Sequence, residues 1–298
     1  MNASPALSWI PYLEQPSFAL GPVRIQAFGI IVACATLIGL TLGRRLFRVR
    51  GLDVAVGDGM AWYAVVAGFI VAHLFSVVFY FPHVVANDPL SIFRFWENIS
   101  SFGGMLGGML GIGMYFRFKA PEVTREARWA YLDVVAVVFA VSLTIGRIAC
   151  SLAHDHPGTI TTFPLSVSLE SASAQNYIVE VYRSANRADE VPSDVTLGQL
   201  GFHDLGLYEF LYLGVVVVPM LAFFSRRTSR PRPPGSLVAL FVVLYMPVRF
   251  LLDFLRVSDT RYAGLTPAQW ICALALLATP VVWMRLRGRP LSTESALA

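Results

Sequence analysis

Four polar side chains follow one another along one apolar stretch near residue 250. Tyr245, Arg249 and Asp253 are spaced four residues apart, and Arg256 follows three residues later. On an α-helix this spacing places all four on one face. A guanidinium donates two parallel hydrogen bonds, which suits phosphate oxygens. The spacing therefore predicts a cationic pocket for an anionic head group, with Asp253 orienting a guanidinium. The alternative is a structural Arg–Asp pair whose charged ends reach toward water.

Two further ionisable residues lie in apolar surroundings. Arg147 comes near the end of one apolar segment, and Glu209 comes near the start of another. A buried charge is costly unless it is paired. We therefore expect Arg147 to lie across from Arg249, with Glu209 pairing with one of these arginines. An interfacial anchor is the alternative for Arg147.

Three histidines lie close to these segments. His154 and His156 flank Asp155 and precede Pro157-Gly158. This run could bind a metal, but without cysteines or further clustered ligands a Pro-Gly turn is the favoured interpretation, and we predict no metal site. His203 precedes the segment with Glu209 and is a candidate external base, because the unperturbed pKa of histidine is ~6.5. Its alternative is a solvated helix cap.

A glycine-rich segment begins at Gly103-Gly104 and continues through Gly107, Gly108 and Gly111. Glycines four residues apart make a smooth groove on a helix. Close packing against a second helix is the first interpretation. A lipid chain lying in the groove is the second, and it would make Gly103 and Gly104 substrate-binding residues.

The composition indicates what surrounds these residues. Of the 298 residues, 56% are hydrophobic and only 14% are charged, whereas a soluble domain carries roughly 25% charged residues. This excludes a disordered chain and predicts an all-α integral membrane protein, with one membrane-embedded domain over 1–298. Three scattered cysteines (Cys34, Cys150, Cys272) are too few for a disulfide framework.

Seven segments are long and apolar enough to cross a bilayer core of ~30 Å as helices. The expected spans are 25–43, 59–81, 99–116, 131–148, 207–224, 235–252 and 265–283. Fifteen of the 23 basic residues fall in 44–58, 117–130, 225–234 and the C-terminal tail. These four stretches share one side if the spans alternate, which predicts an outside N-terminus and an inside C-terminus. The same distribution explains the net charge of +4 without nucleic acid.

One connection is long and faces outside in this topology. Residues 153–206 are expected to form a small external head. The stretch Pro164–Glu170 alternates apolar and polar residues, and Tyr177–Arg183 is a second strand candidate. With Ser171–Asn176 as the turn, these segments predict a β-hairpin.

The order of these motifs resembles that of the prolipoprotein diacylglyceryl transferases, multi-pass enzymes of the bacterial inner membrane. Five motifs carry the resemblance: Phe18–Arg24 with Gly29, Asp88–Trp96 with Gly103-Gly104, Gly146-Arg147-Ile148, Leu207-Tyr208-Glu209, and Tyr245–Arg256 with Asp259 and Gln269. The resemblance implies that phosphatidylglycerol, a membrane lipid, donates its diacylglyceryl group to the lipobox cysteine of a prolipoprotein signal peptide. Glycerol phosphate leaves, and no cofactor is implied.

The resemblance also implies roles for single residues. Arg147 and Arg249 match the family's essential arginines, Tyr245 and Arg256 match directly, and Asp253 stands where the family usually has a glutamate. The substrate-binding set is then Tyr245, Asp253, Arg256, Glu209, Gly103 and Gly104.

Two departures concern proton transfer. Phe102 stands where the family typically has a histidine, and Cys150 where it has an asparagine. Either His154, His156 or His203 serves as the base, with His154 and His203 as the catalytic candidates, or the chain is a divergent branch with altered activity. A non-catalytic phospholipid-binding homologue and an enzyme with a different acceptor are the other hypotheses.

Overall fold

The computed structural model describes residues 8, 10–20, 23–79, 82–94, 99–192, 194–226, 232–258 and 261–287. Seven residues of the expected spans and motifs lie outside these ranges, as does the side chain of Phe102; they are Gly21, Pro22, Tyr80, Phe81, Phe95, Trp96 and Asp259. The chain divides into two compact units. The first comprises Met1–Gly39, Phe139–Pro231 and Ala239–Ala298, and the second comprises Leu40–Val138 with Arg232–Val238.

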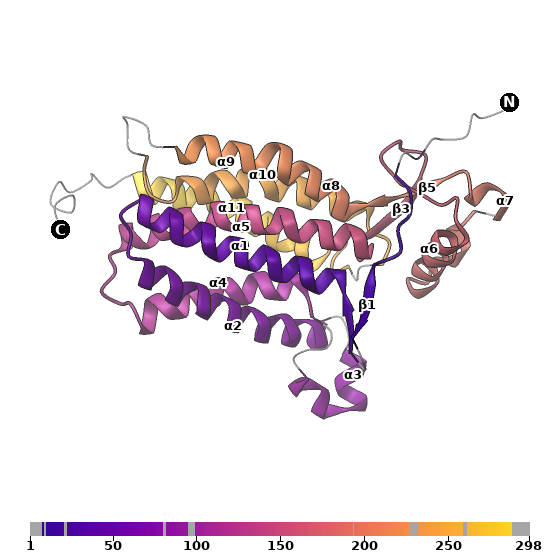
Figure 1. Ribbon diagram of the computed structural model, residues 1–298, viewed down its shortest axis with the longest axis horizontal. Helices are drawn as coiled ribbons and strands as arrows, with labels where there is room; N and C mark the ends of the chain where they lie inside the picture. The colour runs from indigo at the N-terminus through magenta and orange to yellow at the C-terminus, as the bar shows by residue number, and fades with distance from the viewer. Residues whose placement is uncertain are drawn as a thin grey trace. The chain divides into compact units, whose positions relative to one another are not determined.

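Long apolar helices dominate both units (Figure 1). They are α1 (Ala27–Val49), α2 (Val54–Phe79), α4 (Ser101–Phe118), α5 (Arg125–Ala153), α8 (Leu205–Tyr212) continuing through a π-helical turn (Leu213–Val217) into α9 (Val218–Ser225), α10 (Ser236–Leu252) and α11 (Pro267–Arg287). In the part of the chain that the structure describes, five helical segments are long and apolar enough to cross a membrane. They are α1, α2, α5, Leu205–Ser225 and Ser236–Leu255. The prediction of an all-α membrane protein is confirmed; the count of seven spans stays a prediction.

The glycine-rich helix α4 packs directly on α2 within the second unit, and the two run side by side in Figure 1. A Cβ atom added at Gly103 would lie 2.6 Å from the Phe75 Cβ, and one at Gly107 would lie 2.5 Å from the Ala67 carbonyl oxygen. No side chain fits at such distances, so glycine permits this approach. The close-packing interpretation is therefore confirmed at Gly103 and Gly107. At Gly104 the nearest atom would be 3.7 Å away, which is ordinary contact.

A buried carboxylate holds the start of α10 in the second unit. The Asp133 side chain on α5 accepts hydrogen bonds from the backbone N–H groups of Gly235, Leu237 and Val238, at 2.8, 2.8 and 3.1 Å. The first N–H groups of a helix have no partner within the helix. Asp133 satisfies three of them and places a negative charge at the positive end of the helix dipole.

The predicted β-hairpin of the head is wrong. The segment Tyr177–Arg183 lies in helix α6 (Ala172–Ser184), and only Val167–Ser168 of the first predicted strand is extended, as β4. The Ser171 side chain caps α6 by accepting from the Ala174 N–H at 3.2 Å. Ala174, Ile178 and Tyr182 recur every fourth residue and are buried in the core of the head. This helical period overrides the apparent alternation.

The sheet of the head has three antiparallel strands in the order β3-β5-β4. They are β3 (Pro157–Thr161), β5 (Gly201–Asp204) and β4. Strand β3 directly follows α5, and β5 directly precedes α8. The sheet therefore ties the ends of these two helices together. The remaining elements are the hairpin β1 (Ser17–Leu20) and β2 (Val23–Gln26), the short helices α3 (Pro82–Asn87) and α7 (Asp194–Leu197), and 3-10 turns at Pro89–Phe93, Ala188–Glu190 and Asp253–Leu255.

Candidate functional site

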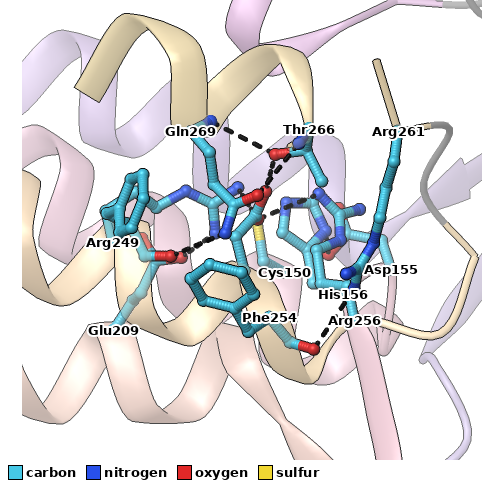
Figure 2. Close-up of polar contacts among 12 residues, drawn as sticks. Cys150, Asp155, His156, Glu209, Arg249, Phe254, Arg256, Arg261, Thr266 and Gln269 are labelled. Atoms are coloured by element: carbon cyan, nitrogen blue, oxygen red, sulfur yellow. Dashed lines mark hydrogen bonds and ion pairs between the residues drawn. The ribbon is translucent and has the colours of Figure 1, made fainter. Parts of the chain in front are cut away.

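A single buried carboxylate joins the two arginines singled out from the sequence. Glu209 on α8 lies with one oxygen 2.6 Å from Nη1 of Arg249 on α10, and its other oxygen is 3.0 Å from Nε of Arg147 on α5. The Tyr245 hydroxyl donates to that second oxygen at 2.5 Å. Figure 2 shows Glu209 and Arg249 facing each other from their two helices. The expected pairing of Glu209 with an arginine is present, and it involves both.

These groups are enclosed by protein. Glu209 is fully buried, and Arg147 and Arg249 are 6% and 8% exposed. Removing charged groups from water costs several kcal/mol per ion unless the partners compensate. The two guanidinium groups form such a compensated set with two carboxylates, Glu209 and Asp253.

Asp253 forms the second centre of the network. One oxygen lies 3.0 Å from Nη2 of Arg249 and 3.7 Å from Nη1 of Arg256. Its other oxygen accepts a hydrogen bond from the Thr266 hydroxyl. Asp253 therefore orients Arg249, as the four-residue spacing predicted, and also contacts Arg256.

Thr266, which donates to Asp253, lies beside Gln269 in Figure 2. The Thr266 N–H donates to the Gln269 side chain at 2.9 Å, and the Gln269 N–H donates back to the Thr266 hydroxyl oxygen at 3.2 Å. This reciprocal pair is a capping box at the start of α11. The sequence reasoning missed it as a part of the site, although Thr-Pro-Ala-Gln before an apolar helix is its sequence signature.

Arg261 adds a further cation that the sequence reasoning did not single out. Its side chain is exposed, and Nη2 donates to the Phe254 carbonyl oxygen at 3.3 Å. Figure 2 draws it beside Arg256. The sequence offers no helical spacing that would have linked it to Arg249.

His154 is buried in the head. Its Nδ1 lies 2.7 Å from Asp204 Oδ2 and its Nε2 lies 3.2 Å from the Leu13 carbonyl oxygen. The Tyr12 ring stacks on the imidazole with a centroid distance of 4.7 Å. Both ring nitrogens are thus engaged: Nδ1 contacts β5 of the head, and Nε2 contacts the N-terminal segment.

His203 lies on β5 and contacts the Tyr208 hydroxyl through Nδ1 at 2.9 Å. Burial lowers the pKa of His203, so the ring favours its neutral form. His156 lies between the end of α5 and the start of β3, with Nδ1 2.8 Å from Asp155 Oδ1. Gly103 and Gly104 belong to the second compact unit, where they lie against α2.

The arrangement can bind an anion through directional donors. Each guanidinium carries five N–H groups, and the carboxylate contacts of Arg147 and Arg249 use only some of them. The remaining N–H groups suit the oxygens of a phosphate. In the described part of the chain, no group of three or more His, Cys, Asp or Glu residues could hold a metal ion.

Comparison with known proteins places this chain in a family. The model of the family described as prolipoprotein diacylglyceryl transferase matches residues 15–285. The chain belongs to this family. It is 29% identical to the phosphatidylglycerol–prolipoprotein diacylglyceryl transferase of Chromohalobacter salexigens, over 91% of this chain and 89% of that protein.

Two other relatives carry the same name. The protein of Chromobacterium violaceum is 26% identical over 94% of this chain and 97% of its own length. That of Mannheimia succiniciproducens is 27% identical over 91% of this chain and 90% of its own length. The resemblance to the prolipoprotein diacylglyceryl transferases noted from the motifs is therefore confirmed over nearly the whole chain.

Proposed function

We propose that the chain transfers the diacylglyceryl group of phosphatidylglycerol to the lipobox cysteine of an exported prolipoprotein. The observation that carries this proposal is the buried pair Arg147 and Arg249, joined by Glu209 in a member of this transferase family. The cysteine thiolate attacks the glyceryl carbon, the carbon–oxygen bond to the phosphate breaks, and glycerol phosphate leaves. Negative charge grows on the leaving phosphate, where fixed N–H donors stabilise it most.

The arginines have the leading role in this proposal. Arg147 and Arg249 bind the phosphate of the lipid, while Glu209 and Asp253 hold the two guanidinium groups in place. Tyr245 fixes the Glu209 carboxylate, and Arg256 adds charge beside Asp253. A guanidinium that is already positioned loses little entropy when the substrate arrives.

Complementation tests the function in cells. A bacterial strain depleted of its own transferase should regain growth and lipidated lipoproteins when it expresses this chain. The Arg249→Ala variant, present in the membrane at the same level, should not support growth. If the native chain accumulates in the membrane and growth still fails, the proposed function is contradicted.

We further propose that the site opens at the outer face of the bacterial inner membrane. Helix α5 begins at Arg125, and Arg147 lies 22 residues further along, which is ~33 Å on a helix and about the thickness of the bilayer core. Under the positive-inside rule Arg125 and Arg128 face the cytoplasm, so Arg147 lies near the other surface. This agrees with seven spans, an outside N-terminus and an exported acceptor.

An accessibility measurement tests this orientation. A cysteine introduced at Glu180, an exposed position on α6, should react with a membrane-impermeant thiol reagent added outside spheroplasts. The native chain, with Cys34, Cys150 and Cys272 alone, is the control. Labelling at position 180 only after the membrane is broken would reverse the topology.

A further inference from the structure

His156 and Asp155 form an oriented pair at the junction of α5 and β3. Nδ1 of His156 lies 2.8 Å from Asp155 Oδ1, and the His156 side chain is 11% exposed. Nδ1 thus meets Asp155 as an ion-pair contact, and in the described residues no hydrogen bond involves Nε2 of His156. The pair therefore presents one engaged nitrogen and one available nitrogen.

The backbone around His156 is fixed between the elements that carry the arginines and their acids. The His156 carbonyl oxygen accepts from the N–H of Leu205, the first residue of α8, at 3.2 Å. The next carbonyl oxygen, of Pro157, accepts from the Val257 N–H at 3.4 Å, just beyond Arg256. A Cβ at Gly158 would lie 2.8 Å from the His203 Cβ and 3.1 Å from the Leu255 carbonyl oxygen. Strand β3 is thus packed closely against His203 on one side and Leu255 on the other.

Asp155 is suited to hold the imidazole. Burial raises the pKa of Asp155, but its contact with His156 and the charge of Arg147 outweigh burial, so the pKa of Asp155 is lowered. It is therefore a carboxylate at neutral pH. A carboxylate on Nδ1 fixes the tautomer that leaves the lone pair on Nε2, and it stabilises the imidazolium that forms when Nε2 takes a proton.

His156 also lies near the phosphate-binding groups. Figure 2 draws His156 and Asp155 in the same close-up as Arg249 and Arg256. The other histidines whose side chains are described are engaged elsewhere. His154 uses both ring nitrogens, His203 contacts Tyr208, and His73 contacts the Ser91 carbonyl oxygen in the second unit.

We propose that His156 is the general base that removes the proton from the acceptor thiol, and that Asp155 is its positioning residue. This assignment rests on the proposed function. Nε2 takes the thiol proton, the sulfur forms its bond to the glyceryl carbon, and the carbon–oxygen bond to phosphate breaks with its electron pair on the leaving oxygen. The imidazolium gains a positive charge as the leaving phosphate gains a negative one, and the proton then passes to glycerol phosphate or to water.

Acceptors with a thiol and with a selenol separate this role from phosphate binding. A selenocysteine peptide is ionised at neutral pH and needs no base, whereas a cysteine thiol is mostly protonated. With the cysteine peptide, His156→Gln should lower the transfer rate by about 10²–10⁴-fold. With the selenocysteine peptide, the same variant should come within about tenfold of the native chain. Asp155→Asn should show a smaller loss that the selenol also relieves.

Arg249→Ala is the matched control, because its defect lies with the leaving phosphate and should persist with both acceptors. Phosphatidylglycerol binding should be unchanged in His156→Gln. Near-native activity of His156→Gln on the cysteine peptide, an equal deficit on both peptides, or loss of lipid binding in parallel with rate would each overturn the assignment. Activity of the native chain is measured alongside; its absence would contradict the proposed function itself.

Discussion

The Arg249→Ala variant is expected to transfer at least about a hundredfold more slowly than the native chain, because it lacks one guanidinium of the phosphate site. Its guanidinium contacts Glu209 at 2.6 Å and Asp253 at 3.0 Å through different nitrogens. Only a planar fork can contact both carboxylates and still donate to a phosphate. An ammonium group carries the charge without this geometry, so Arg249→Lys should recover little of the rate.

Initial rates of thioether formation, with lipid and peptide varied separately, measure this effect. Arg183→Ala is a suitable control, because Arg183 is an exposed arginine on α6 that pairs with Glu180, also exposed. That variant should transfer at the native rate. If Arg249→Lys retained more than about half of the native activity, a bidentate role for Arg249 would be excluded.

The Glu209→Ala variant is expected to lose about 3–5 kcal/mol of stability, the usual cost of removing one partner from a buried ion pair. Without this carboxylate, Arg147 loses its ion-pair partner, and Arg249 keeps only Asp253. Glu209→Gln should lose less stability than Glu209→Ala, because glutamine fills the same space, but it also removes the negative charge. Both variants should therefore unfold at lower temperature and accumulate less in the membrane.

Thermal unfolding of the detergent-solubilised protein measures this loss. Glu180→Gln is the matched control, because Glu180 is an exposed glutamate in an ion pair with an arginine, and exposed pairs contribute little. An unfolding temperature of Glu209→Ala equal to that of the native chain would show that the arginines do not depend on this carboxylate.

The contacts among these charged residues could be predicted from residue spacing along one helix and from the cost of burying a charge. The spacing of Tyr245, Arg249 and Asp253 gives one helical face wherever the helix packs. The cost of burying Glu209 and Arg147 requires that they find opposite charges. Both arguments need no knowledge of the tertiary structure, and the contacts of Glu209 with Arg147 and Arg249 agree with them.

Other features depend on tertiary contacts and were missed. The segment Tyr177–Arg183 resembled a strand because apolar residues that are only partly buried stand between its core residues. The buried side chains of Ile178 and Tyr182 lie four residues apart, which is the helical period. The link from Thr266 to Asp253 joins two helices through a loop. The sequence favoured His154 and His203 over His156, because it does not show that His154 contacts the Leu13 carbonyl oxygen, that His203 contacts Tyr208, or that His156 faces Asp155.

The most direct test of the account is turnover by the purified chain. The protein is reconstituted with phosphatidylglycerol and a peptide that contains a lipobox cysteine, and the products are followed by mass spectrometry. The account predicts a thioether-linked diacylglyceryl peptide and one equivalent of glycerol phosphate, with both products lost in Arg249→Ala. Lipid that binds to the native chain without forming either product, while a control transferase turns over in the same vesicles, would contradict it.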